Sequence, residues 1–160
     1  MSENRPSFVH VSYIASTIDK VFAALTDGKF TQEYWGGEII ESDWKKGSPV
    51  QLTRRKSGKK SVHGVVLECD PPSLLVMSWN HVKPGEAPAP APATKVTFVL
   101  KQVTPGNVRL EVKHEAHEPG SEVPEGVREG WPAVLSSLKS YLETGEALES
   151  TRQWEQKYDV

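Results

Sequence analysis

The fold of this chain is decided by the stretch GWPAVLSSLK at residues 130–139, which lies in the middle of a long amphipathic segment. Apolar side chains recur there at the spacing of one broad stripe on an α-helix: Val127, Trp131, Val134, Leu135, Leu138 and Leu142. The pattern predicts a helix from residue 124 or 125 to residue 143, ended by Gly145, with Pro132 near the start of its regular part. We expect this helix to lie against the concave side of a sheet.

The residues before this helix alternate between apolar and polar side chains, as in strands with one buried face. The alternation predicts strands at residues 8–14, 39–44, 50–54, 62–70, 74–79, 96–100 and 108–114. Turn sequences such as Ser57-Gly58 and Pro71-Pro72 separate neighbouring strands, and short hairpins imply antiparallel pairing. The sequence therefore predicts an α+β fold in which an antiparallel sheet wraps around a long C-terminal helix.

Three shorter segments complete the predicted organisation. Thr17 or Ser16 caps a helix that breaks at Asp27-Gly28, and a second short helix follows at residues 29–34. Residues 84–93, rich in proline and alanine, are predicted to form an extended loop. Beyond Gly145, the spacing of Leu148, Thr151, Trp154 and Tyr158 predicts a short amphipathic helix. It would pack on the same chain or on a second copy, and the sequence slightly favours a homodimer.

Composition limits the classes of function. A length of 160 residues fits one domain over 1–160, with its core at 8–145 and a tail at 146–160. The net charge of -2 provides no positive field for a nucleic acid or an anionic membrane. No apolar run is long enough for a signal peptide or a spanning helix. Cys69 is the only cysteine, which favours a reducing compartment, so we expect a cytoplasmic protein that binds neither nucleic acid nor membrane.

Several motifs, in this order, resemble one known family. They are Tyr13-Ile14-Ala15, Ala24-Leu25-Thr26-Asp27, Tyr34-Trp35-Gly36-Gly37, Asp70-Pro71-Pro72 followed by Trp79, and the stretch at residues 130–139. Together they resemble the homologues of the C-terminal domain of the heat shock protein 90 ATPase activator, a family of the START-like (SRPBCC) superfamily. The resemblance covers about residues 8–145. It implies a helix-grip fold, often with an apolar cavity between the sheet and the last helix, and it makes a chaperone a candidate partner.

The hollow between sheet and helix is the candidate functional site, because small-molecule sites are apolar clefts with a few polar groups. A small hydrophobic or amphipathic ligand is the partner we expect there, with no cofactor. Strand parity and the helical stripe predict its lining: Trp35, Trp44, Leu52, Val66, Met77, Trp79, Phe98, Leu110, Val112, His114, Trp131, Leu135 and Leu138.

Catalytic and metal-binding alternatives have weaker support in the sequence. Asp43, Glu68 or His114 would serve as acid or base in an enzyme of cyclase or dehydratase type. Cys69 lies beside Asp70, which raises a thiol pKa and disfavours a nucleophile. His114 and His117, with Glu115 or Glu118, do not complete a metal site, because adjacent strand positions point to opposite faces.

A basic cluster surrounds Ser57-Gly58 and consists of Arg54, Arg55, Lys56, Lys59 and Lys60. It is either a solvated hairpin tip or a surface for phosphate or an acidic partner. The second possibility belongs with the hypothesis of a chaperone-interacting module.

Overall fold

The computed structural model describes residues 7–82, 94–116 and 125–158, in which seven strands and four helices follow one another. In chain order they are β1 (Ser7–Ile14), α1 (Ile18–Thr26), α2 (Gly28–Tyr34), β2 (Glu38–Ser42), β3 (Pro49–Arg54), β4 (Lys60–Asp70), β5 (Leu74–His81), β6 (Thr94–Thr104), β7 (Asn107–Glu115), α3 (Glu125–Thr144) and α4 (Glu149–Tyr158). The predicted loop at 84–93 lies outside the described residues.

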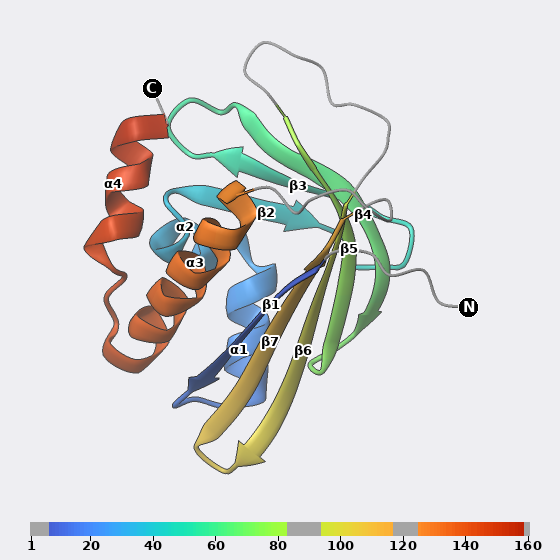
Figure 1. Cartoon of the computed structure of the whole chain (residues 1–160), viewed down its shortest axis with the longest axis vertical. Helices are drawn as coiled ribbons and strands as arrows, with labels where there is room; N and C mark the ends of the chain where they lie inside the picture. Colours follow the sequence, from blue (N-terminus) through green and yellow to red (C-terminus); the bar gives the residue numbers. More distant parts are fainter. Residues whose placement is uncertain (1–6, 83–93, 117–124, 159–160) are drawn as a thin grey trace.

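The strands form one antiparallel sheet in the order β1-β7-β6-β5-β4-β3-β2, as the short hairpins predict. Register shifts interrupt β3, β4 and β6, and such irregularities bend strands. Gly64 in β4 permits a close approach to β5, because a Cβ at this position would collide with the carbonyl oxygen of Ser78. The result is a curved sheet that partly encloses α3 (Figure 1).

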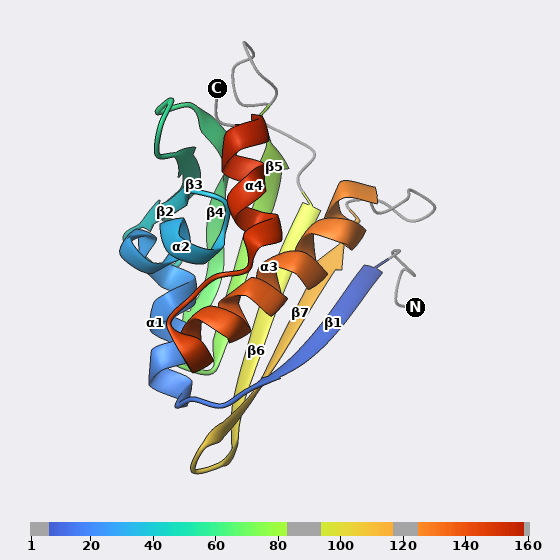
Figure 2. The ribbon, with the colours of Figure 1, turned by 90° about the vertical axis from the view of Figure 1, so that its left-hand side faces the viewer.

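Helix α3 crosses the concave face of this sheet, in front of β6 and β7 (Figure 2). Leu135 and Leu138 of α3 are completely buried, and so are Met77 and Leu110 on the inner face of the sheet. Burial of each such side chain contributes about 1.5–3 kcal/mol. This arrangement is the helix-grip fold, as predicted.

Helices α1 and α2 connect the first two strands. The Thr17 side chain accepts a hydrogen bond from the Lys20 N–H and caps α1, which confirms one of the two predicted caps. Asp27 ends α1 and also caps α2, where its carboxylate accepts from the Lys29 N–H at 2.9 Å. The Tyr34 hydroxyl then donates to the Ala24 carbonyl at 2.7 Å and holds the two helices together.

Helix α3 begins at Glu125, which confirms the predicted start, but it continues through Pro132, so its regular part does not begin near that residue. The predicted end of one strand was wrong. Strand β2 ends at Ser42 and not at Trp44, because the backbone of Trp44 takes a left-handed conformation with φ of 57°. Trp44 is therefore outside the sheet, and strand parity does not apply to its side chain.

Helix α4 packs on its own chain. The Ser137 hydroxyl of α3 lies 2.9 Å from the Thr151 hydroxyl of α4, and both residues are completely buried. Trp154 lies over Gly36, where a Cβ would come within 3.2 Å of its side chain. Trp154 thus contacts its own chain. Of the two tail aromatics that favoured a dimer, only Tyr158 is left, and its side chain is not among the described ones.

Candidate functional site

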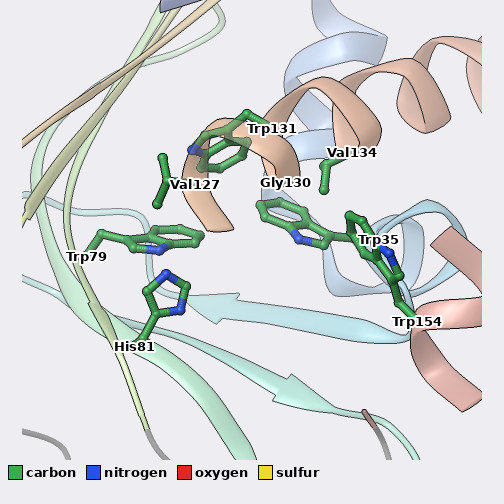
Figure 3. Close-up of a pocket in the computed structure, with 8 residues that line it drawn as sticks. All are labelled: Trp35, Trp79, His81, Val127, Gly130, Trp131, Val134 and Trp154. Carbon is green, nitrogen blue, oxygen red and sulfur yellow. The ribbon is translucent and has the colours of Figure 1, made fainter. Parts of the chain in front are cut away.

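A pocket of about 100 Å³ lies between the sheet and the N-terminal half of α3, open to solvent on one side. Its walls come from the end of α2, from β5, from α3 and from α4 (Figure 3). It is lined by Trp35, Trp79, His81, Val127, Gly130, Trp131, Val134 and Trp154. Nearly all of this surface is aromatic or aliphatic.

Three indole rings form the inner wall. The rings of Trp35 and Trp79 are nearly parallel, with centroids 6.1 Å apart and an interplanar angle of 15°. The ring of Trp131 meets both of them, at 5.4 Å from Trp35 and 5.5 Å from Trp79. Behind it, Phe98 makes an edge contact with Trp131 at 5.6 Å. Such pairs contribute roughly 0.5–1.5 kcal/mol each beyond their burial, so the rings stabilise one another in the wall.

A chain of hydrogen bonds holds Trp131 in place from behind. Its indole N–H donates to Nδ1 of His114 at 3.0 Å, so the ring proton of His114 must lie on Nε2. That nitrogen is 2.7 Å from the Thr94 hydroxyl, which donates in turn to the Trp79 carbonyl at 2.8 Å. Burial, and to a smaller extent His81, lowers the pKa of His114 to about 4. His114 is therefore a neutral group that orients two pocket residues.

His81 is the polar residue of the pocket wall. Its ring makes an edge contact with Trp79 at 6.3 Å, and the residue is exposed at the end of β5. Desolvation by the surrounding protein lowers its pKa. No described residue forms a hydrogen bond with this ring.

The predicted site residues separate into three groups. Trp35, Trp79 and Trp131 line the pocket, and His114 lies directly behind it. The aliphatic and phenyl side chains of the prediction belong to the buried core: Leu52, Val66, Met77, Phe98, Leu110, Val112, Leu135 and Leu138. Trp44 is only partly buried and borders a different depression, of about 580 Å³, beside α1 and β2.

The sequence did not identify five of the lining residues: His81, Val127, Gly130, Val134 and Trp154. Val127 and Val134 lie on the predicted apolar stripe of α3, so helical periodicity carried a signal for both. Trp154 stood out as a tail aromatic without an assigned contact. His81 and Gly130 have no periodic signal, because one ends a strand and the other has no side chain.

The basic hairpin is largely occupied by intramolecular ion pairs. Arg54 lies 3.6 Å from the Glu38 carboxylate. Arg55 forms a two-pronged ion pair with Glu155 of α4, and Lys56 lies 3.7 Å from the same carboxylate. Two residues of the cluster, Arg55 and Lys56, therefore anchor α4.

The residues considered for catalysis lie apart from the pocket or are already hydrogen-bonded. Asp43 and Glu68 are exposed, and both ring nitrogens of His114 are engaged. Burial raises the pKa of the Cys69 thiol, and the negative charge of Asp70 raises it further to a smaller extent. In the described ranges, no group of three or more His, Cys, Asp or Glu side chains is placed to hold a metal ion. His117 and Glu118 lie outside these ranges.

A curved antiparallel sheet around a C-terminal helix, with an apolar pocket between them, defines a START-like protein. Residues 15–143 match the family model described as "Activator of Hsp90 ATPase homolog 1-like protein", and the chain belongs to this family. No curated protein matches the sequence. None of the helices over the described residues has the length and apolarity needed to cross a membrane.

Solved structures share this fold. ChR145 from Cytophaga hutchinsonii is 26% identical with a TM-score of 0.68, over 91% of this chain and 98% of that one. The Aha1 dimer from Colwellia psychrerythraea is 21% identical with a TM-score of 0.66, over 88% and 98% of the two chains. CalU16 from Micromonospora echinospora is 21% identical with a TM-score of 0.64, over 94% and 82%.

Proposed function

We propose that this chain binds a small hydrophobic or amphipathic molecule in the pocket between β5, α3 and α4. The observation that supports the proposal is a solvent-open space whose walls are indole and aliphatic groups. Apolar clefts with a few polar groups are the usual form of small-molecule sites. The imidazole of His81, which forms no hydrogen bond with a described residue, would meet the polar end of such a ligand.

The size of the pocket limits the buried part of the ligand. At about 100 Å³ it is smaller than the roughly 150 Å³ engineered cavity that holds benzene. A single ring or a short branched chain would fill it, and the rest of the ligand would project into solvent. A chaperone-interacting module has less structural support, because Arg55 and Lys56 are paired with Glu155.

Gly130 provides the test. It borders the pocket, and a Cβ added there meets no atom within 4 Å, so the backbone accepts a side chain at this position and we expect Gly130→Leu to narrow the pocket. The matched control is Gly106→Leu in the β6–β7 turn, where a Cβ also meets no atom within 4 Å.

The measurements are native mass spectrometry of gently purified protein and a thermal-shift screen of lipids and aromatic compounds. We expect a ligand that stabilises the wild type and Gly106→Leu, and at least a tenfold weaker effect on Gly130→Leu. A protein that carries no bound species, and that no compound stabilises, would contradict the proposal.

A further inference from the structure

Two indole N–H groups beside the pocket form no hydrogen bond with any residue that the structure describes. Trp35 and Trp79 are only 8% and 6% exposed, yet neither indole forms a hydrogen bond with a described residue. Trp131 differs, because its N–H is bonded to His114. No buried side-chain nitrogen or oxygen in the described ranges lacks a partner, so the N–H groups of Trp35 and Trp79 are not sealed in the core. Both N–H groups therefore have access to solvent, and both residues line the open pocket.

The two donors belong to one wall. Their rings are nearly parallel and 6.1 Å apart. In Figure 3 both indole nitrogens are drawn on the lower edges of the rings, which is the side on which His81 lies. An occupant of the pocket therefore meets two N–H donors together with a flat apolar surface.

The charges around the pocket decide which acceptor suits these donors. No Lys, Arg, Asp or Glu is among the described residues that line it, and desolvation lowers the pKa of His81. A carboxylate would lose hydration here without gaining a cation, which is costly. A neutral carbonyl oxygen has two lone pairs and no such penalty.

We propose, on the basis of the proposed function, that the pocket selects small neutral carbonyl compounds with a flat ring, such as aryl ketones, esters or lactones. The ring packs on the indole wall, and the carbonyl oxygen accepts a hydrogen bond from the N–H of Trp35, Trp79 or both. The specificity then depends on two donors that form no hydrogen bond with a described residue, because an occupant without an acceptor leaves them unsatisfied.

Three probes of nearly equal size separate the contribution of the ring from those of a neutral carbonyl group and of a negative charge: acetophenone, ethylbenzene and benzoate. Affinity is measured by titration with ¹H–¹⁵N NMR, in which each indole N–H gives its own signal. We expect acetophenone to bind more tightly than both other probes and to shift the indole signals of Trp35 and Trp79. Ethylbenzene should leave these two signals close to their free positions.

Trp35→Phe and Trp79→Phe each keep an aromatic ring and remove one donor. We expect one or both to weaken acetophenone roughly three- to tenfold, with ethylbenzene changed by less than about twofold. Trp44→Phe is the matched control, because Trp44 does not line this pocket. If a pocket variant fails to fold, the indole shifts of the wild type with the three probes decide the question.

The outcomes separate the two proposals. Equal binding of acetophenone and ethylbenzene would overturn the carbonyl assignment and leave small-molecule binding intact. Tightest binding of benzoate would overturn the preference for a neutral ligand. Failure of all three probes would overturn the assignment, and the absence of any stabilising compound in the wider screen would also remove the proposed function.

Discussion

His114 shows how a single buried side chain can orient the residues of a pocket wall from behind. It accepts from the Trp131 indole and lies within hydrogen-bonding distance of the Thr94 hydroxyl, so both ring nitrogens are engaged. A proton on Nδ1 would remove the acceptor that Trp131 needs. The ring is 1% exposed, and no acid that could compensate a positive charge is hydrogen-bonded to it. The neutral form is thus a requirement of the packing.

This requirement makes stability depend on pH. The pKa of His114 is about 4 in the folded protein and 6.5 as its ordinary value. Between these values the unfolded chain binds a proton that the folded chain excludes, so stability falls as pH decreases from 6.5 and levels off below 4. We expect a loss of about 2–3 kcal/mol between pH 7 and pH 4.5 from this residue.

Urea denaturation at several pH values checks this expectation. His114→Gln keeps a donor and an acceptor but cannot become charged, so its stability should decline less steeply than that of the wild type over this range. His81, whose pKa is also lowered, contributes with the same sign in both proteins. His10→Gln on β1 is the control and should decline like the wild type. Parallel curves for His114→Gln and wild type would show that His114 is not the group responsible.

At the scale of the element, α4 is attached to the body of the molecule by polar contacts. Its apolar contribution to the core is modest, whereas Glu155 is 8% exposed and meets both Arg55 and Lys56 of the β3–β4 hairpin. A Cβ at Gly37 would collide with the Glu155 carboxylate, so the turn after α2 must carry glycine for this ion pair to form. The hairpin, the turn and the helix therefore fit together as a unit.

Glu155→Ala should loosen α4 more than the rest of the molecule. Removal of a charge-assisted hydrogen bond of this kind costs about 1.5–3 kcal/mol. We expect faster amide hydrogen exchange along residues 149–158 and increased solvent quenching of Trp154 fluorescence. Glu149→Ala on the same helix removes only an exposed pair with Arg152 at 3.8 Å, and should change stability by less than about 0.5 kcal/mol. Equal effects of the two substitutions would refute the anchoring role of Glu155.

Elements were predicted well from the sequence because their periodicity is local. The alternation at Val108, Leu110 and Val112 and the helical stripe of α3 each extend over several repeats, so neighbouring residues reinforce one pattern. Trp44 fails the same reasoning because a left-handed backbone ends the alternation before it. Parity identifies the inner face of the sheet, but it does not distinguish a side chain that fills the core from one that borders a space.

The pocket depends on contacts between distant segments, which no local pattern contains. Trp154 reaches it only because α4 folds back on α3 through Ser137 and Thr151. Gly130 contributes by lacking a side chain, and His81 by ending a strand at the open side. Trp35, Trp79 and Trp131 were within reach of prediction because bulky aromatic residues suit both a core and a ligand site.

At the scale of the whole molecule, the two ends of α3 are held differently. Near its C-terminus, Lys139 Nζ donates to the Tyr13 carbonyl at 2.6 Å, and Glu143 accepts from the Ala15 N–H at 2.8 Å. These bonds join the start of the sequence to its last long helix. The other end of α3 borders the pocket through Val127, Gly130 and Trp131. The C-terminal end of α3 is thus hydrogen-bonded to the end of β1 and the residue after it, whereas the N-terminal end borders the pocket.

Ligand binding should therefore stabilise the molecule unevenly. A ligand at ten times its Kd adds about 1.4 kcal/mol, which corresponds to an increase in Tm of roughly 3–6 °C. We expect amide exchange to slow most at residues 127–131 and 151–155, and least at 139–143, as hydrogen-exchange mass spectrometry would show. Gly130→Leu with the same compound serves as the control. Uniform protection along α3 would contradict the unequal attachment of its ends.

The proximity of the indole rings also has a spectroscopic consequence. Three rings with centroids 5.4–6.1 Å apart are close enough for their electronic transitions to couple. Circular dichroism in the aromatic region should thus contain an exciton signal that depends on the relative orientation of these chromophores. A ligand that tilts one ring would change this signal, so circular dichroism of the unlabelled protein would detect occupation of the pocket.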